Sequence, residues 1–114
     1  MERPAIFECP LDDLEIRDAR GFVWQADDRE RRGFVVRSKD AVFAYHNVCP
    51  HAGNPLNWKP HAFLTRSRDL IMCSVHGATF EIESGICVGG PCPGRTLRPL
   101  RAELREGRVI VYPE

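Results

Sequence analysis

Short apolar runs are separated by polar stretches in the first half of the chain. Residues 21–26, 33–37 and 41–45 are runs rich in β-branched and aromatic side chains, and the polar residues 38–40 separate the last two runs. This pattern predicts a strand followed by a β-hairpin. The charged run 27–32 lies between the first two expected strands, and we expect it to form a solvated turn.

The second half of the chain contains short runs of the same kind. Four of them have the length and composition of strands, at residues 70–72, 79–83, 97–104 and 108–112. Turn-forming residues follow the second run at Ser84-Gly85 and separate the last two runs at 105–107, which predicts a C-terminal hairpin. Residues 58–69 have weak periodicity, and we expect an extended loop there, with a short helix or hairpin of its own.

Composition narrows the fold class. The 114 residues include nine glycines and nine prolines, and few helical patterns run without interruption. With 43% hydrophobic residues, the chain can bury one core without disulfide staples. We therefore expect a single all-β domain over residues 1–114.

Charge and cysteine content bear on partners and location. Sixteen basic and sixteen acidic residues give a formal net charge of zero, so no global electrostatic attraction to nucleic acid or an anionic membrane is expected. The N-terminus lacks a basic segment followed by an apolar stretch, and no run approaches the roughly 20 apolar residues that span a bilayer. An odd number of cysteines, two of them beside histidines, fits a metal site in a reducing compartment, and we expect a cytoplasmic protein. The five cysteines are Cys9, Cys49, Cys73, Cys87 and Cys92.

Two short motifs carry the candidate chemistry. Cys49 is followed by His51, and Cys73 is followed by His76, each pair on an expected loop beside a strand. Thiolate and imidazole ligands suit zinc or an iron–sulfur cluster, and two pairs on separate loops can converge on one four-ligand site. The alternating order of cysteine and histidine differs from that of a common zinc finger. A structural zinc site stays open as the alternative.

The order Cys-x-His and then Cys-x-x-His resembles the cluster motif of the Rieske family of 2Fe-2S proteins. The similarity extends to Gly77, to Phe80-Glu81 ahead of the Ser84-Gly85 turn, and to residues 90–93, which look like the family's proline-rich third loop. The spacer at residues 52–72 is longer than is usual in small Rieske ferredoxins.

The resemblance implies one Rieske-type 2Fe-2S cluster as the cofactor. Cys49 and Cys73 would bind the inner iron, while His51 and His76 would bind the outer iron near the surface. The implied fold is an antiparallel β-sandwich with a small cluster-binding subdomain. That subdomain would consist of loops at about residues 47–58, 72–80 and 89–94.

Charge and hydrogen bonding set the expected reduction potential. A diferric cluster with two thiolates and two neutral imidazoles is uncharged and becomes singly negative on reduction, so it accepts an electron more readily than a four-cysteine cluster. The loop-tying cysteines of respiratory members would fall at Asn54 and Ser74, and the hydroxyl donors of high-potential members at Ala78 and Phe80. None of these residues matches. We therefore expect a low-potential, ferredoxin-like protein, at roughly −150 mV.

The resemblance implies a Rieske-type ferredoxin, a monomeric one-electron carrier between a reductase and a terminal oxygenase or similar enzyme. An oxygenase also needs a mononuclear iron held by two histidines and a carboxylate, and only His46 and His61 are left over. We therefore do not expect the chain to be an enzyme on its own. Two alternatives stay open: a small subunit of a reductase such as nitrite reductase, and a redox-sensing regulatory module.

The histidine-bound iron lies near the surface in the family, so electrons are expected to pass through His51 or His76 to a docked partner. A small apolar collar around them would suit a weak redox encounter. The residues expected in this collar are Pro55, Leu56, Pro91 and Pro93. Trp58 and the loop at 58–69 would extend the patch and select the partner.

The remaining histidines and cysteines are expected to be structural. His46 and His61 have no partner motif, so we interpret them as structural or exposed side chains. Cys9, Cys87 and Cys92 are expected to pack as small apolar residues. For Cys87 and Cys92, a local disulfide or a redox-sensing thiol pair is the alternative, because they lie five residues apart.

Overall fold

The computed structural model describes residues 4–50, 53–57, 59–75 and 77–113. These residues form nine strands and one short 3-10 helix, η1 (Leu11–Asp13), which confirms the expected all-β class. No helix in the described part is long and apolar enough to cross a membrane. The strands are β1 (Phe7–Pro10), β2 (Asp18–Ala26), β3 (Arg29–Ser38), β4 (Ala41–His46), β5 (Leu70–Met72), β6 (Thr79–Glu81), β7 (Cys87–Gly89), β8 (Pro99–Arg105) and β9 (Arg108–Tyr112).

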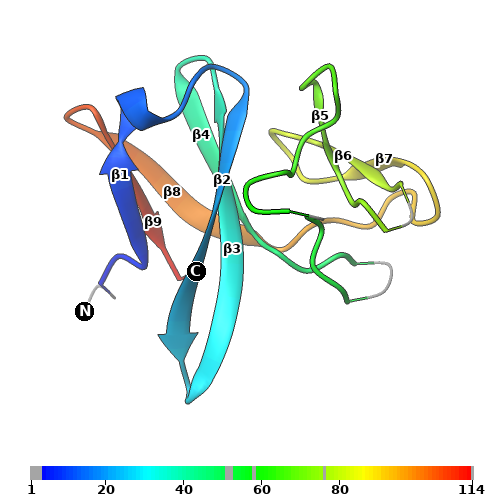
Figure 1. Cartoon of the computed structure of the whole chain (residues 1–114), viewed down its shortest axis with the longest axis horizontal. Coiled ribbons are helices and arrows are strands. Elements are labelled where there is room, and N and C mark those ends of the chain that lie inside the picture. Colours follow the sequence, from blue (N-terminus) through cyan, green and yellow to red (C-terminus); the bar gives the residue numbers. More distant parts are fainter. Residues whose placement is uncertain (1–3, 51–52, 58, 76, 114) are drawn as a thin grey trace.

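The main sheet contains six antiparallel strands in the order β1-β9-β8-β4-β3-β2. Figure 1 shows that it folds over, so that β1 and β9 face β2 and β3 as in a sandwich. The two end strands meet through Phe7 and Phe22, whose rings stack with centroids 4.7 Å apart. The apolar core between these layers includes Trp24, Val35 and Val109.

Strand β3 is buried on both faces, which makes it the wall shared by two cores. Gly33, Phe34, Val35 and Val36 are all buried. Because side chains alternate along a strand, Val35 faces the sandwich core while Phe34 and Val36 face a second core. The continuous apolar run in the sequence therefore corresponds to a strand with no solvent-facing side over these four residues.

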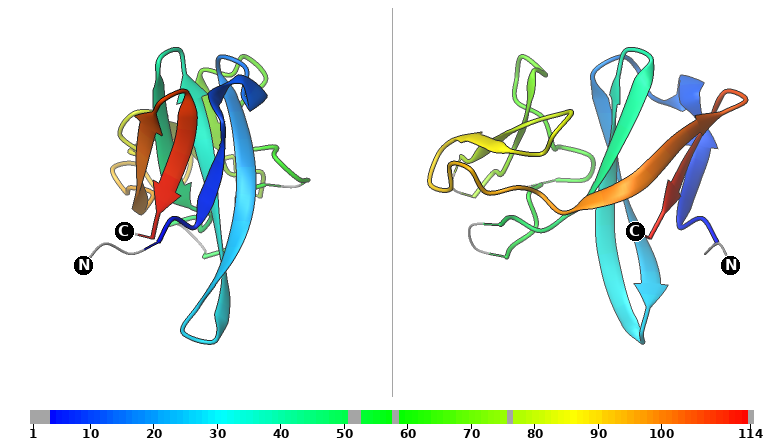
Figure 2. Two further views of the ribbon diagram at one scale, coloured as in Figure 1. Left: turned by 90° about the vertical axis from the view of Figure 1, so that its left-hand side faces the viewer. Right: turned by 180° about the vertical axis from the view of Figure 1, so that it is seen from behind.

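The second core lies under a three-stranded sheet, β5-β6-β7, on the other side of β3. Figures 1 and 2 show this small sheet beside the main sheet and away from both chain ends. Contacts between the two parts include the Phe34 and Phe63 rings, which stack at 4.3 Å, and the Tyr45 hydroxyl, which donates a 2.6 Å hydrogen bond to the Ile82 carbonyl. The small sheet is thereby fixed in place as a subdomain.

The prediction of a solvated turn at 27–32 is wrong for most of these residues. Only Asp27 and Asp28 form the turn, with φ of 53° and 60°, and residues 29–32 belong to β3. Two consecutive residues with positive φ make the tight hairpin connection that fits twisted strands. The charged side chains are compatible with a strand here because the hairpin tip projects beyond the cores (Figure 1).

The loop expected at 58–69 forms a small hairpin with β5. Leu64 pairs with Ile71, and the Met72 amide donates to the Phe63 carbonyl at 2.9 Å. Phe63 is 1% exposed and belongs to the second core. The segment is therefore built into the subdomain, although its sequence has little periodicity.

Tyr45 provides a pH-dependent test of the attachment between the two sheets. Burial, with repulsion from Glu83 as a smaller cause, raises the pKa of Tyr45 from 10 to about 12. Because the folded state binds the phenolic proton more tightly, its stabilisation is complete below pH 10 and is lost as the pH rises from 10 to about 12.

We expect Tyr45→Phe to lower the free energy of unfolding by about 1 kcal/mol near neutral pH, because the Ile82 carbonyl loses its donor. The variant should also lose less stability than the wild type when urea unfolding is repeated above pH 10. Parallel stability profiles for the two proteins would contradict this account.

Candidate functional site

The two cysteines of the motif begin backbone turns of the same form. The Cys49 amide donates to the Asn54 carbonyl at 2.8 Å, and the Gly53 amide donates to the Cys49 carbonyl at 2.7 Å. The second loop repeats both bonds: Cys73 to the Ala78 carbonyl at 2.8 Å, and Gly77 to the Cys73 carbonyl at 2.9 Å. The chain therefore presents two equivalent five-residue turns, each starting at a cysteine.

Both turns require a left-handed backbone at their last residue. Gly53 has φ of 78° and Gly77 has φ of 72°. A Cβ at either position would meet no atom of the described residues within 4 Å, so glycine is needed there for its backbone conformation. A glycine four residues after each cysteine is therefore the sequence signal for equivalent loops, and Gly53 carries it as clearly as Gly77.

The expected ligands divide between described and undescribed residues. Cys49 is 1% exposed and Cys73 is 0% exposed, and both belong to the second core. Buried thiol sulfurs at the start of matching loops are the donor chemistry that an iron–sulfur cluster needs. His51 and His76, the other expected ligands, lie outside the described residues.

Hydrogen bonds tie the first loop to the second. The Leu56 carbonyl accepts two bonds from Ser74, at 2.8 Å from its amide and 2.7 Å from its hydroxyl. The side-chain amide of Asn54 also donates to the Cys73 sulfur at 3.6 Å. Asn54 and Ser74 are the two positions where loop-tying cysteines would fall, and here the link is made without a disulfide.

Asn47 fixes the start of the first loop, a role that the sequence did not indicate. Asn47 is 6% exposed, and among the described residues it is the polar one that is buried. Its side-chain oxygen accepts from the Leu56 amide at 2.7 Å, and its side-chain nitrogen donates to the Asn57 oxygen at 2.8 Å. These bonds hold the loop closed behind Cys49.

The expected apolar collar is wrong at Leu56, which is fully buried in the second core. Its backbone is held by Asn47 and Ser74, so its side chain points inward. Pro55, Pro91 and Pro93 are exposed as expected. Two further apolar residues are exposed beside the turns, Val48 at 47% and Val75 at 56%.

The proline-rich loop packs on both cysteine turns. The Arg95 guanidinium donates to the Pro50 carbonyl of the first turn at 2.9 Å. Gly90 has φ of 90°, and a Cβ on it would lie 2.7 Å from Cα of Ala78 in the second turn. The loop can approach this closely because position 90 carries no side chain.

Cys87 and Cys92 form a buried thiol pair in the same region. Cys92 donates to Cys87, with the sulfurs 3.4 Å apart, and the Cys87 thiol donates to the Gly89 carbonyl at 3.1 Å. Burial, together with this contact, raises the pKa of Cys92 to about 11, so its thiol stays protonated near neutral pH. Both residues lie in the second core, and Cys9 lies in the sandwich core, as expected for packing residues.

The two remaining histidines have structural contacts. His46 packs against Trp24 with ring centroids 5.6 Å apart, and burial, with the nearby Arg98 and Arg31 charges, lowers its pKa. His61 accepts a 3.0 Å hydrogen bond at Nδ1 from the Gly21 amide on edge strand β2. His61 thereby attaches the segment after residue 58 to the main sheet.

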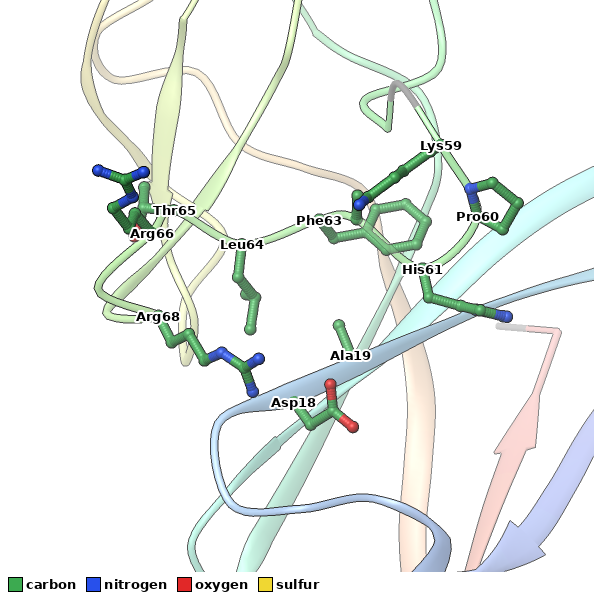
Figure 3. A pocket seen from close by; sticks show the side chains of 11 residues that line it. Asp18, Ala19, Lys59, Pro60, His61, Phe63, Leu64, Thr65, Arg66 and Arg68 are labelled. Atoms are coloured by element: carbon green, nitrogen blue, oxygen red, sulfur yellow. The ribbon is translucent and has the colours of Figure 1, made fainter.

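A pocket of about 350 Å³ lies between that segment and the start of β2. Figure 3 shows Leu64 and Arg68 extending toward Asp18 and Ala19 across this space. Arg68 also donates to the Arg17 carbonyl at 3.5 Å. The pocket is therefore a seam between the subdomain and the main sheet. Trp58, expected to contribute to a partner surface, lies outside the described residues.

Comparison with known proteins agrees with this geometry. A family model described as the Rieske [2Fe-2S] domain matches residues 6–112. The ferredoxin of carbazole 1,9a-dioxygenase from Nocardioides aromaticivorans has a similar fold, with a TM-score of 0.72 at 22% identity, covering 98% of this chain and 100% of that chain. The structure described as a complex of reduced oxygenase and oxidized ferredoxin in carbazole 1,9a-dioxygenase gives a TM-score of 0.71 at 24% identity over 93% and 90%.

A curated sequence relative is longer. The carnitine monooxygenase oxygenase subunit of Acinetobacter pittii is 27% identical over 89 residues, covering 68% of this chain and 22% of that protein. The chain therefore spans about a fifth of the length of this relative.

The matched turns give a test with an internal control. We expect Gly53→Ala and Gly77→Ala each to lower the free energy of unfolding by about 1 kcal/mol, because alanine is strained at positive φ. They should also reduce the iron retained per chain after desalting. Gly107→Ala is the control, since Gly107 has φ of 76°, open space around it and a place in the remote β8–β9 turn. Loss of iron from all three variants to the same extent would contradict a specific role for the paired turns.

Proposed function

Because the chain belongs to the Rieske [2Fe-2S] domain family, we propose that it is a Rieske-type ferredoxin, carrying single electrons from a reductase to a terminal oxygenase or a similar enzyme. Its cofactor is a Rieske-type 2Fe-2S cluster. The observation that carries the proposal is the pair of equivalent turns, each opening with a buried cysteine. Such a site exchanges one electron without forming or breaking bonds in a substrate.

Four residues are proposed as ligands. Cys49 and Cys73 would hold one iron, and His51 and His76 the other. The buried positions of the two cysteines support this assignment, because a sulfur-bound iron would then lie inside the subdomain. Two neutral imidazoles in place of two thiolates leave the oxidised site uncharged, which favours acceptance of an electron.

The surroundings of the turns would exclude water and present a docking face. Ser74 and Asn47 hold the first loop, and Arg95 attaches the proline-rich loop to it. Around these fixed loops, exposed apolar side chains offer the small patch that suits a short-lived redox encounter. Its members are Val48, Pro55, Val75, Pro91 and Pro93.

The proposed partner class rests on a structural relative. That relative is a ferredoxin in complex with an oxygenase, according to its description. The similarity covers most of both chains, which supports the same kind of partner for this chain. We also propose a cytoplasmic location, consistent with cysteines that are not needed as disulfide staples, and a monomeric state.

A second candidate is favoured by the carnitine monooxygenase relative, an oxygenase subunit. In that case the chain would be the cluster-bearing part of an oxygenase, which also needs a mononuclear iron. The carrier is the better-supported proposal, because the match to the ferredoxin of carbazole 1,9a-dioxygenase covers 98% of this chain and 100% of that chain. A reductase subunit and a regulatory module are further alternatives. Stoichiometric co-purification with a larger protein would favour them over a free carrier.

Iron counting tests the ligand set. We expect the wild type to bind two irons and two sulfides per chain, and Cys49→Ser or His76→Ala to lose the visible absorption, because each removes a ligand. Cys9→Ala is the control, since Cys9 is also buried but lies in the sandwich core. Zinc in place of iron, or full iron content in both ligand variants, would contradict the proposal. A third iron would favour the oxygenase candidate.

Electron-transfer kinetics test the docking face. We expect Val75→Ser to weaken binding to a Rieske oxygenase by about fivefold, because about 1 kcal/mol of apolar burial is lost. Val23→Ser is a matched control, since Val23 is 57% exposed against 56% for Val75 but lies on β2. The dependence of the stopped-flow transfer rate on oxygenase concentration gives the affinity, with carbazole 1,9a-dioxygenase components as the trial partners. Equal effects of the two substitutions would argue against a docking face at the turns.

A further inference from the structure

The side chain of Asn54 makes an unusual contact between the two turns. Asn54 closes the first turn, where its carbonyl accepts from the Cys49 amide. Its side-chain nitrogen lies 3.6 Å from the sulfur of Cys73, which opens the second turn. A donor on the first turn thus contacts the cysteine sulfur of the second.

The orientation of this amide is determined by its neighbours. One N–H donates to the Pro55 carbonyl at 2.8 Å, and the other is directed at the Cys73 sulfur. Exchanging the oxygen and nitrogen of Asn54 would place its oxygen against the Pro55 carbonyl, which can only accept, and against the thiolate that Cys73 would carry as an iron ligand. The donor role toward Cys73 is therefore the only orientation that both neighbours accept.

Asn54 keeps this orientation despite an unfavourable consequence for its oxygen. Oδ1 is buried and has no hydrogen-bond partner among the described residues. A buried polar atom without a partner is destabilising and calls for an explanation. The most direct explanation is that the hydrogen bond from the amide nitrogen to the Cys73 sulfur outweighs this loss.

We propose that Asn54 is a positioning residue that raises the electron affinity of the cluster by donating a hydrogen bond to the Cys73 thiolate. This inference rests on the proposed function, in which Cys73 binds iron. A hydrogen bond to a charged acceptor is stronger than one between neutral groups, and reduction adds negative charge to the cluster and its sulfurs. The bond therefore stabilises the reduced state more than the oxidised state. It supplies a donor that neither Ala78 nor Phe80 can provide.

The test compares midpoint potentials from spectroelectrochemical titration of the cluster-loaded protein. Asn54→Leu removes the donor at similar size, and we expect it to lower the equilibrium constant for reduction about tenfold, which equals about 59 mV for one electron. Asn54→Asp keeps the shape but replaces the donor with an oxygen, and it should lower the potential at least as far. The Asn54→Asp variant also keeps the test possible if Asn54→Leu fails to fold.

Ser74→Ala is the control. Ser74 links the same two loops, but its hydroxyl donates to the Leu56 carbonyl and not to a cysteine sulfur. We expect this variant to be less stable toward urea while its midpoint potential stays at the wild-type value. In electron–nuclear double resonance, Asn54→Leu should lose an exchangeable-proton coupling that Ser74→Ala retains.

Unchanged potentials in both Asn54 variants, or equal shifts in Ser74→Ala and Asn54→Leu, would overturn the inference, because the effect would then be absent or due to loop packing. Iron and sulfide content of each variant separates this result from failure of the proposed function. A wild type without a cluster would contradict the function itself, whereas loaded variants with unshifted potentials would contradict only the role of Asn54.

Discussion

The Leu56 carbonyl accepts both hydrogen bonds of Ser74, 18 residues further along the chain, and thereby joins the two cysteine loops. The proposed site depends on this junction, because each loop contributes one of the two cysteines that we propose as ligands. Leu56 can serve as the junction because its side chain is buried and its amide is held by Asn47. The geometry of the proposed cluster site is thus set by the Leu56 backbone, which is anchored in the core. The uncharged polar side chains of Asn47 and Ser74 form the hydrogen bonds to it.

The remainder of the fold provides rigid attachment for that junction. Strand β4 delivers the chain to Cys49, and its Tyr45 is hydrogen-bonded to Ile82 beyond β6. Strand β3 separates the two cores, so the sandwich and the subdomain share one wall. The proposed one-electron exchange would benefit from such rigidity, because electron transfer is easiest when ligands move little between redox states. The buried cysteines and the fixed loops satisfy that requirement.

The sequence predicted the parts governed by local periodicity and by a specific motif. The strands that became β3 and β4 and the C-terminal hairpin were recognisable as runs of β-branched and aromatic residues around polar turns, and the family from Cys49 and Cys73 with their histidines. It did not predict β1 and β7, which are only four and three residues long and depend on pairing with distant strands. The side-chain hydrogen bonds of Asn47, Asn54 and Ser74 could not be predicted either, because the sequence does not indicate which group a polar loop residue will contact.

The central claim is that sulfur and nitrogen ligands from the paired turns hold one redox-active 2Fe-2S cluster. Electron paramagnetic resonance of the dithionite-reduced protein tests it most directly, since the signal depends on the ligands of the cluster. We expect a rhombic signal with an average g value below that of a four-cysteine cluster. A signal typical of four-cysteine ligation, or no signal from a zinc-loaded protein, would contradict it.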